Sequence, residues 1–177
     1  ESNFIDCFNL KLKKEQERFV SHPIRSLAQA YVYYKQCTPF GVLADGKMVG
    51  YGMVIYDYDE EEYDLWHVMI DAEHQGNGYG RAAVGLFLDY IRQKPFGDSN
   101  LVKLTCHKEN FPALHLYESY GFTPTGAEDE DGEIIKTMNA TYPFEITDSL
   151  NKHYKIGHIN AGAKKTVNLR VNVKKNL

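Results

Sequence analysis

Residues 74–81 read His-Gln-Gly-Asn-Gly-Tyr-Gly-Arg, and the three glycines of this stretch fall on alternate positions. The apolar run Val68-Met69-Ile70 precedes the stretch, and an amphipathic helical pattern follows it over residues 84–91. The order is therefore strand, glycine loop, helix. Glycines let backbone N–H groups approach a ligand closely, and a helix N-terminus favours negative charge. The stretch predicts an anion site, such as one for a pyrophosphate.

The spacing of the glycines distinguishes between kinds of phosphate loop. A P-loop would require Lys and then Ser or Thr after its last glycine, whereas this chain has Arg81-Ala82. The spacing also differs from the Gly-x-Gly-x-x-Gly fingerprint of dinucleotide sites. The pattern Gln75-x-x-Gly78-x-Gly80 resembles the acyl-CoA pyrophosphate loop of the GNAT superfamily of N-acetyltransferases. The alternative interpretation is an ordinary glycine-rich turn between a strand and a helix.

A second motif, over residues 110–122, carries the same resemblance. Asn110 is suited to cap a helix, and Gly121 is suited to end it. GNAT proteins carry Asn-x-x-Ala-x-x-x-Tyr-x-x-x-Gly-Phe at this place in the chain. The sequence has every one of these residues, namely Asn110, Ala113, Tyr117, Gly121 and Phe122.

The resemblance implies acetyl-CoA as the co-substrate, bound in a gap between strands over residues 65–70 and 101–106. Backbone groups of the first strand would bond the pantetheine arm, and backbone amides of residues 75–81 would hold the pyrophosphate. The residues expected to contact acetyl-CoA are Val68, Met69, Ile70, Gln75, Gly76, Asn77, Gly78, Tyr79, Gly80, Arg81, Asn110, Ala113 and Tyr117.

Tyr117 is the expected general acid, because a tyrosine at this position of the family protonates the leaving thiolate. A phenol with a pKa of about 10 stays protonated at neutral pH and can donate. The sequence does not single out one general base. Asp64 shares a strand face with Trp66 by the two-residue period, so it could activate the amine through water. His67 is expected to point to the opposite face, and direct reaction of the small deprotonated fraction of the amine is the further alternative.

The acceptor is expected to be a polyamine. Acidic residues are concentrated at positions 57–64 beside aromatic side chains, which suits a long polycation. The alternative is a solvated acidic turn that has no role in binding. The stretches over residues 26–31, 39–42, 45–51 and 71–76 resemble bacterial spermine/spermidine (diamine) acetyltransferases, and the likeness covers about residues 3–138. Those proteins often have an acid or another polar residue followed by Arg where this chain has Trp66-His67. The residues expected to bind the acceptor are Asp57, Asp59, Glu60, Glu62 and Trp66.

Two other functions stay open. The acceptor could be another amine, namely an amino sugar, an antibiotic, a protein lysine or a protein N-terminus. The chain could also be a non-catalytic acetyl-CoA-binding module, although Tyr117 speaks against that. Homodimers are common in this fold, so a homodimer is the possible assembly.

Composition narrows the class of protein. Residues 140–177 hold seven basic and two acidic side chains, a charge of +5, whereas residues 1–139 carry −9 and the whole chain carries −4. The acidic part favours a cationic substrate over nucleic acid. The three scattered cysteines suit buried thiols in a reducing cytoplasm, and no His/Cys cluster has metal-ligand spacing. No apolar run approaches the ~20 residues of a membrane helix, so a cytoplasmic enzyme is expected.

The pattern of elements predicts an α/β (α+β) fold of GNAT type, with a mixed, twisted, largely antiparallel sheet and helices on both faces. Residues 1–139 would form the acetyltransferase domain, without the strand that opens the family's fold. Helices are expected from residue 2 to about 12, after residue 23, and over 80–93 and 111–120. Strands are expected over 40–44, 48–56, 63–70, 101–107, 121–126 and 133–139. Residues 140–177 would be a basic extension whose alternating segment, 166–173, forms a strand on the sheet edge that the absent strand leaves open, in the same chain or in a partner. The alternative is a loosely attached appendage.

Overall fold

The computed structural model describes residues 2–140, with side chains from residue 5 onward, so the segment 166–173 lies outside the described residues. One six-stranded sheet has the order β1-β2-β3-β4-β6-β5. The strands are β1 (Cys37–Ala44), β2 (Lys47–Asp57), β3 (Glu62–Ile70), β4 (Leu101–Cys106), β5 (Thr123–Glu128) and β6 (Ile134–Asn139). The helices are α1 (Ser2–Phe8), α2 (Pro23–Val32), α3 (Tyr79–Ile91) and α4 (Phe111–Glu118), with single 3-10 turns η1 (Lys14–Gln16) and η2 (Ala72–His74).

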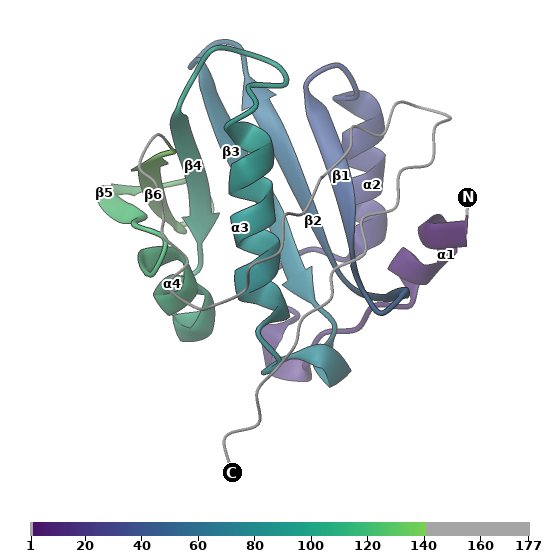
Figure 1. The fold of residues 1–177 in the computed structure, drawn as a ribbon. Helices are drawn as coiled ribbons and strands as arrows, with labels where there is room; N and C mark the ends of the chain where they lie inside the picture. Colours follow the sequence, from purple (N-terminus) through teal and green to yellow (C-terminus); the bar gives the residue numbers. More distant parts are fainter. Residues whose placement is uncertain (1, 141–177) are drawn as a thin grey trace, which may run out of the picture.

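Helices cover both faces of the sheet, which confirms the predicted fold class (Figure 1). One buried cluster joins α3 and α4 to the sheet and includes Phe40, Phe87 and Phe122. The other cluster joins the N-terminal helices to the opposite face and includes Ala30 and Met53. The apolar side chains of α3 recur at helical spacing, so one face of the helix is buried along most of its length. Within residues 2–140 no helix is long and apolar enough to cross a membrane.

The first helix is shorter than predicted, because it ends at Phe8 and not near residue 12. The chain beyond it bonds instead to the end of β3. The Lys11 N–H donates to Asp71 Oδ2 at 2.8 Å, and the Ala72 N–H donates to the Lys11 carbonyl at 2.8 Å. These bonds take backbone groups that a continuing helix would need for itself. The N-terminal segment is thereby tied to the strand that leads into the glycine loop.

A bulge in β3 changes which side chains share a face. Met53 of β2 pairs with His67, but the next residue, Val54, pairs with Leu65, so Trp66 has no partner of its own. Before the bulge Tyr63 and Leu65 pack on the α3 side, and after it Val68 and Ile70 do. The prediction that His67 points away from the face of Trp66 is therefore wrong. The strict two-residue period on which it rested is interrupted at Trp66.

The two central strands stay together over a short distance only. β3 and β4 are the one parallel pair among the described strands, and their pairing is limited to Tyr63 with Val102 and Asp64 with Lys103. From Leu65 to Ile70 the strand β3 has no ladder partner on its β4 side. The strands therefore form a wedge, closed at the Tyr63 end and open toward the glycine loop and α4.

The Tyr63 hydroxyl fastens the closed end of the wedge. It accepts hydrogen bonds from the N–H groups of Phe96 and Gly97 at 3.1 Å each, and it donates to the Gly97 carbonyl at 2.9 Å. The side chain is fully buried. The loop that returns the chain from α3 to β4 is therefore held to β3 by one phenol.

Replacing this hydroxyl should destabilise the fold. Tyr63→Phe would leave two backbone N–H groups without their acceptor, at a cost of about 1–3 kcal/mol. Urea denaturation would measure the change in the free energy of unfolding. Tyr58→Phe is the matched control, because Tyr58 is 54% exposed. Equal stability of the two variants would contradict this role of Tyr63.

Candidate functional site

Two glycines of the loop hold backbone conformations that disfavour other residues. Gly76 has a φ of +80° and Gly78 has a φ of +79°, and Gly78 is the N-cap of α3. A Cβ at either position would meet open space, so the requirement for glycine is conformational. Gly80 differs, because it lies inside the first turn of α3, where a Cβ would touch Ile70 and Leu116 at an ordinary 3.6 Å.

The N–H groups of the loop are available to a ligand. The first turn of a helix has no intrahelical acceptor for its N–H groups, and the Ala82 N–H is the first to bond back, to the Gly78 carbonyl at 3.1 Å. The Asn77 side chain closes the loop by donating to the carbonyls of His74 and Gln75 at 3.1 and 3.3 Å. The loop is thus shaped before any anion arrives, and the helix dipole favours negative charge there.

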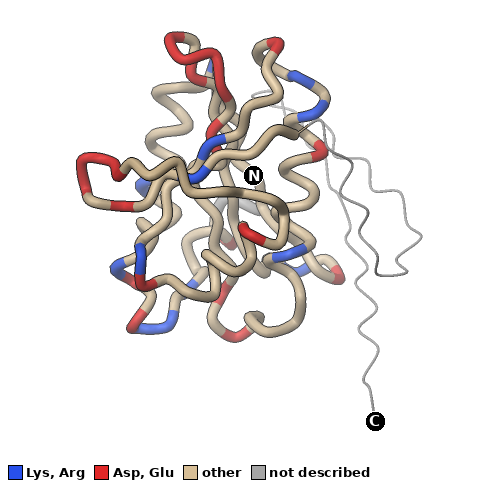
Figure 2. Tube along the Cα trace, turned by 90° about the vertical axis from the view of Figure 1, so that its left-hand side faces the viewer, with Lys and Arg blue, Asp and Glu red and all other residues tan. Residues whose placement is uncertain are grey.

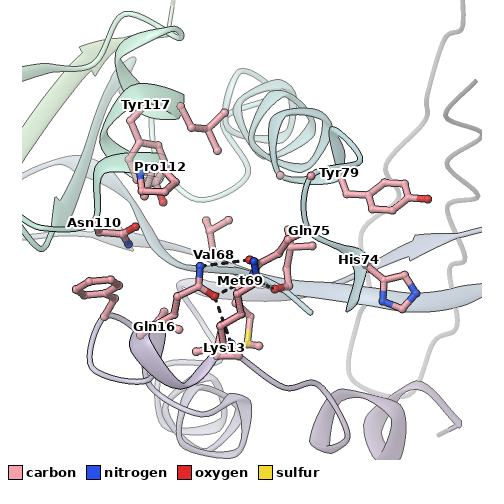
Figure 3. A pocket seen from close by; sticks show the side chains of 18 of the residues that line it. Lys13, Gln16, Val68, Met69, His74, Gln75, Tyr79, Asn110, Pro112 and Tyr117 are labelled. Atoms are coloured by element: carbon pink, nitrogen blue, oxygen red, sulfur yellow. Dashed lines mark hydrogen bonds between the residues drawn. The ribbon is translucent and has the colours of Figure 1, made fainter. Parts of the chain in front are cut away.

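The Gln75 side chain connects the glycine loop to the end of β3 and to η1. Its Nε2 donates to the Ile70 carbonyl at 3.0 Å and to Gln16 Oε1 at 2.8 Å, and Gln16 Nε2 donates back to Gln75 Oε1 at 3.2 Å (Figure 3). The side-chain amide of Gln75 is therefore bound to protein groups. Gln16 comes from η1, so the N-terminal segment fixes the start of the glycine loop.

Asp71 completes this support at the end of β3. Its carboxylate accepts hydrogen bonds from the N–H groups of Lys11 and Glu73 and lies 3.2 Å from His74 Nδ1. Burial alone would raise the pKa of this carboxyl, but the two backbone hydrogen bonds and His74 hold it below its usual range. Asp71 therefore stays ionised and keeps the end of β3 attached to Lys11.

A cavity of about 470 Å³ occupies the open side of the wedge. Figure 3 shows Asn110, Pro112 and Tyr117 on its α4 side and Lys13 and Gln16 on its N-terminal side. The cavity is lined by eleven of the residues expected to contact acetyl-CoA: Val68, Met69, Ile70, Gln75, Gly76, Gly78, Tyr79, Gly80, Asn110, Ala113 and Tyr117. Asn77 and Arg81 are not in this lining.

Asn110 lines the cavity as expected, but it does not cap α4 through its side chain. Its side-chain amide is therefore available to the cavity. Sequence reasoning missed the contribution of the N-terminal segment, from which Leu12, Lys13, Gln16, Phe19 and Val20 line the cavity. No local motif marks these residues, because the bonds to Asp71 and Gln75 bring them to the site.

Tyr117 lies where this cavity meets a second one. The second cavity, of about 260 Å³, shares six lining residues with the first: Phe19, Val20, Val68, Asn110, Ala113 and Tyr117. Tyr117 is 8% exposed, and its hydroxyl has no hydrogen bond to another described residue. Burial, and then the charges of Cys106 and Glu133, raise the pKa of the phenol above its ordinary value. The hydroxyl is therefore protonated at neutral pH and can donate into the site.

Acidic and basic side chains face the second cavity from different elements. Asp129, Asp131 and Glu133 come from the turn between β5 and β6, and Arg25 comes from α2. Asp129 Oδ1 accepts the N–H groups of Asp131 and Glu133 at 3.0 and 2.8 Å, so the turn has a fixed shape. Sequence reasoning placed Glu133 at the start of a strand and gave these three acidic residues no role in the site, although the run of acids from 128 to 133 was a readable signal.

Trp66 and His67 both line the second cavity, as the bulge in β3 requires. Their rings lie 5.5 Å apart between centroids. His67 Nε2 lies 3.3 Å from Gln29 Oε1, and its buried Nδ1 has no partner among the described residues. Burial, reinforced by the charge of Arg25, lowers the pKa of His67 to about 4. The imidazole is therefore neutral at physiological pH.

The acidic turn between β2 and β3, which the sequence favoured as the acceptor site, lies elsewhere. Asp57, Asp59 and Glu60 do not line either cavity that meets at Tyr117. Asp57 Oδ1 instead accepts the N–H groups of Asp59 and Glu60 at 2.9 and 3.2 Å. Figure 2 shows this turn and the β5–β6 turn as two separate acidic segments, the first at the top of the view.

Asp64 and Glu62 lie at the closed end of the wedge and also outside both cavities. Glu62 forms an ion pair with Lys103 of β4. Burial raises the pKa of Asp64 to about 7, with Lys103 opposing the shift and Glu62 and Asp57 adding to it. The Glu62–Lys103 ion pair therefore joins β3 to β4 where the strands are still paired.

Comparisons with known proteins support a single family. Residues 5–122 match the Acetyltransferase (GNAT) family. The spermine/spermidine N(1)-acetyltransferase of Bacillus subtilis (strain 168) is 28% identical over 109 residues, which cover 58% of this chain and 68% of that protein.

Two solved structures share the fold. The ribosomal-protein-S18-alanine N-acetyltransferase from Escherichia coli has a TM-score of 0.59 at 20% identity, covering 82% of this chain and 92% of the other. The spermidine N-acetyltransferase from Vibrio cholerae, in complex with CoA and spermine, has a TM-score of 0.57 at 22% identity, covering 77% of this chain and 86% of the other.

Proposed function

The chain belongs to the acetyltransferase (GNAT) family, and on this premise we propose that it transfers the acetyl group of acetyl-CoA to a primary amine of a polyamine such as spermidine or spermine. The observation that carries the proposal is the pair of cavities that meet at Tyr117. One cavity ends at free backbone N–H groups, and the other contains three carboxylates. A thioester and an amine would therefore approach Tyr117 from opposite sides.

The first cavity suits acetyl-CoA in three respects. The glycine loop and the start of α3 offer N–H groups and a helix dipole to the pyrophosphate. The unpaired edge of β3, from Leu65 to Ile70, offers backbone groups to the amides of the pantetheine arm, as a neighbouring strand would. The Asn110 amide faces the same space. Holding the thioester in one orientation lowers the barrier by several kcal/mol, about the range known for well-oriented reactants.

The second cavity suits a cationic amine. Asp129, Asp131 and Glu133 face it together, and Trp66 adds an aromatic surface for an ammonium group. A polyamine carries several ammonium groups, of which only one must lose a proton to react. The remaining charges can lie against carboxylates. The Bacillus subtilis relative bears a polyamine acetyltransferase name, which supports the same acceptor here.

Blocking the glycine loop should abolish binding of acetyl-CoA. Gly78→Asp places a carboxylate where the pyrophosphate would lie, and like charges side by side cost several kcal/mol. We expect affinity for CoA, measured by titration calorimetry, to fall by about a hundredfold or more.

Gly46→Asp is the matched control for this variant. Gly46 lies in the turn between β1 and β2, has the same φ of +79°, and also faces open space. The two variants therefore carry the same backbone strain and the same new charge. Loss of CoA affinity in both, or in neither, would contradict the role of the loop.

Neutralising the β5–β6 turn should weaken binding of the polyamine. The double variant Asp129→Asn/Asp131→Asn keeps the hydrogen-bond acceptor that shapes the turn and removes two charges. We expect the KM for spermidine to rise about tenfold, with the KM for acetyl-CoA unchanged. The effect should shrink with added salt, because exposed charges are screened beyond about 10 Å at 0.1 M.

Asp57→Asn/Asp59→Asn removes two charges from the turn that sequence reasoning favoured, and Asp57 shapes that turn in the same manner. We expect this control to leave the KM for spermidine near that of the wild type. A larger effect from the β2–β3 turn would return the acceptor site to residues 57–62. A panel of other amines would identify a better acceptor if spermidine is not turned over.

A further inference from the structure

Glu133 differs from the two other carboxylates of the second cavity. Asp131 is exposed, and one carboxylate oxygen of Asp129 accepts hydrogen bonds from N–H groups of its own turn. Glu133 is half-buried and forms no ion pair with another described residue. Its carboxylate therefore faces the cavity without a cation of its own.

The backbone fixes Glu133 beside the junction of the two cavities. The residue immediately precedes β6, and the first residue of that strand, Ile134, pairs with Cys106 at the end of β4. Cys106, Tyr117 and Glu133 line the same cavity. After burial, the negative charge of Glu133 contributes to the raised pKa of the Tyr117 phenol and of the Cys106 thiol. The carboxylate therefore acts on the hydroxyl expected to protonate the leaving group.

We infer that Glu133 is the general base of the acetyl transfer, which removes a proton from the acceptor ammonium group in the second cavity. The inference rests on the proposed function and adds to it the residue that makes the amine nucleophilic. Asp64, the base expected from the sequence, lies at the closed end of the wedge and outside both cavities. His67 is neutral but has a pKa of about 4, which makes it a weak base.

The proton balance of the reaction is complete with these two residues. The Glu133 carboxylate takes one proton from the ammonium group and later passes it to water. The neutral nitrogen attacks the thioester carbonyl, so that a C–N bond forms and the C–S bond breaks. Tyr117 gives its proton to the leaving thiolate, and the second proton lost from the nitrogen restores the phenol. The products are the acetylamide, CoA thiol and one proton in water.

The surroundings of Glu133 make its carboxylate a stronger base than an exposed glutamate. Burial raises the pKa of its carboxyl, the Thr105 hydroxyl and His107 oppose the shift, and Asp129 and Asp131 add to it. The other titratable or charged side chains that face the cavity are Arg25, His67, Cys106 and Tyr117. A carboxylate with a raised pKa holds a proton more firmly once it has taken it. Activity should therefore fall as the pH drops through the pKa of Glu133.

The pH profile of the variant Glu133→Gln tests the assignment. At pH 7 we expect kcat/KM for spermidine to fall by about 10²–10⁴. In the wild type the rate should level off above the pKa of Glu133. In Glu133→Gln it should keep rising about tenfold per pH unit, because only the neutral fraction of the amine reacts. Glu133→Asp keeps a carboxylate and should keep the wild-type profile at a lower rate.

Asp131→Asn is the control for Glu133→Gln. We expect it to raise the KM for spermidine and to leave the shape of the pH profile unchanged. The assignment is overturned if Glu133→Gln keeps the wild-type profile or changes only KM while its affinity for CoA is intact. If Glu133→Gln does not fold, Glu133→Asp decides. Loss of the acidic limb of the wild-type pH profile in that variant would likewise overturn the assignment. If spermidine is not a substrate, the polyamine proposal fails by itself, and the best amine of the panel is used for the profile. Turnover of no amine at all would refute both.

Discussion

The parallel pair β3–β4 holds together for two residues and then opens, and the candidate site depends on that divergence. Tyr63 and Asp64 pair with Val102 and Lys103, and beyond them the two strands separate. Unpaired backbone in the middle of a sheet is costly unless it meets another polar partner. The open edge of β3 is therefore a built-in place for a ligand with amide groups. Because this edge runs between the glycine loop and α4, the pyrophosphate of acetyl-CoA would lie at the loop and the thioester would lie near Tyr117.

Supports around the wedge keep it open at one end and closed at the other. The Tyr63 hydroxyl and the Glu62–Lys103 ion pair fasten the closed end. At the open end, Asp71 and Gln75 tie the N-terminal segment to the glycine loop. The Tyr120 hydroxyl donates to the Arg81 carbonyl at 2.5 Å and so joins the chain after α4 to the start of α3. These contacts fix the geometry before any substrate binds, which lowers the entropic cost of binding.

Much of the fold, and much of the cavity proposed for acetyl-CoA, could be predicted from the sequence, because the sequence signals for both are local. The glycines at 76 and 78, and the motif from Asn110 to Phe122, report backbone requirements that neighbouring residues impose. The acceptor side could not be predicted in the same way. The bulge at Trp66 arises from the pairing of β3 with β2 and reverses the face of His67. The approach of the β5–β6 turn to α2, and of residues 12–20 to the wedge, depends on contacts between distant segments.

In the proposed reaction, Tyr117 lies between a thioester and an amine and protonates the leaving thiolate. The most direct measurement is steady-state turnover of Tyr117→Phe beside its calorimetric affinity for CoA. The variant keeps the ring and its packing against Phe122, and it loses only the hydroxyl. We expect wild-type affinity for CoA and turnover lower by about 10²–10⁴. Turnover equal to that of the wild type, with CoA affinity preserved, would contradict this role of Tyr117.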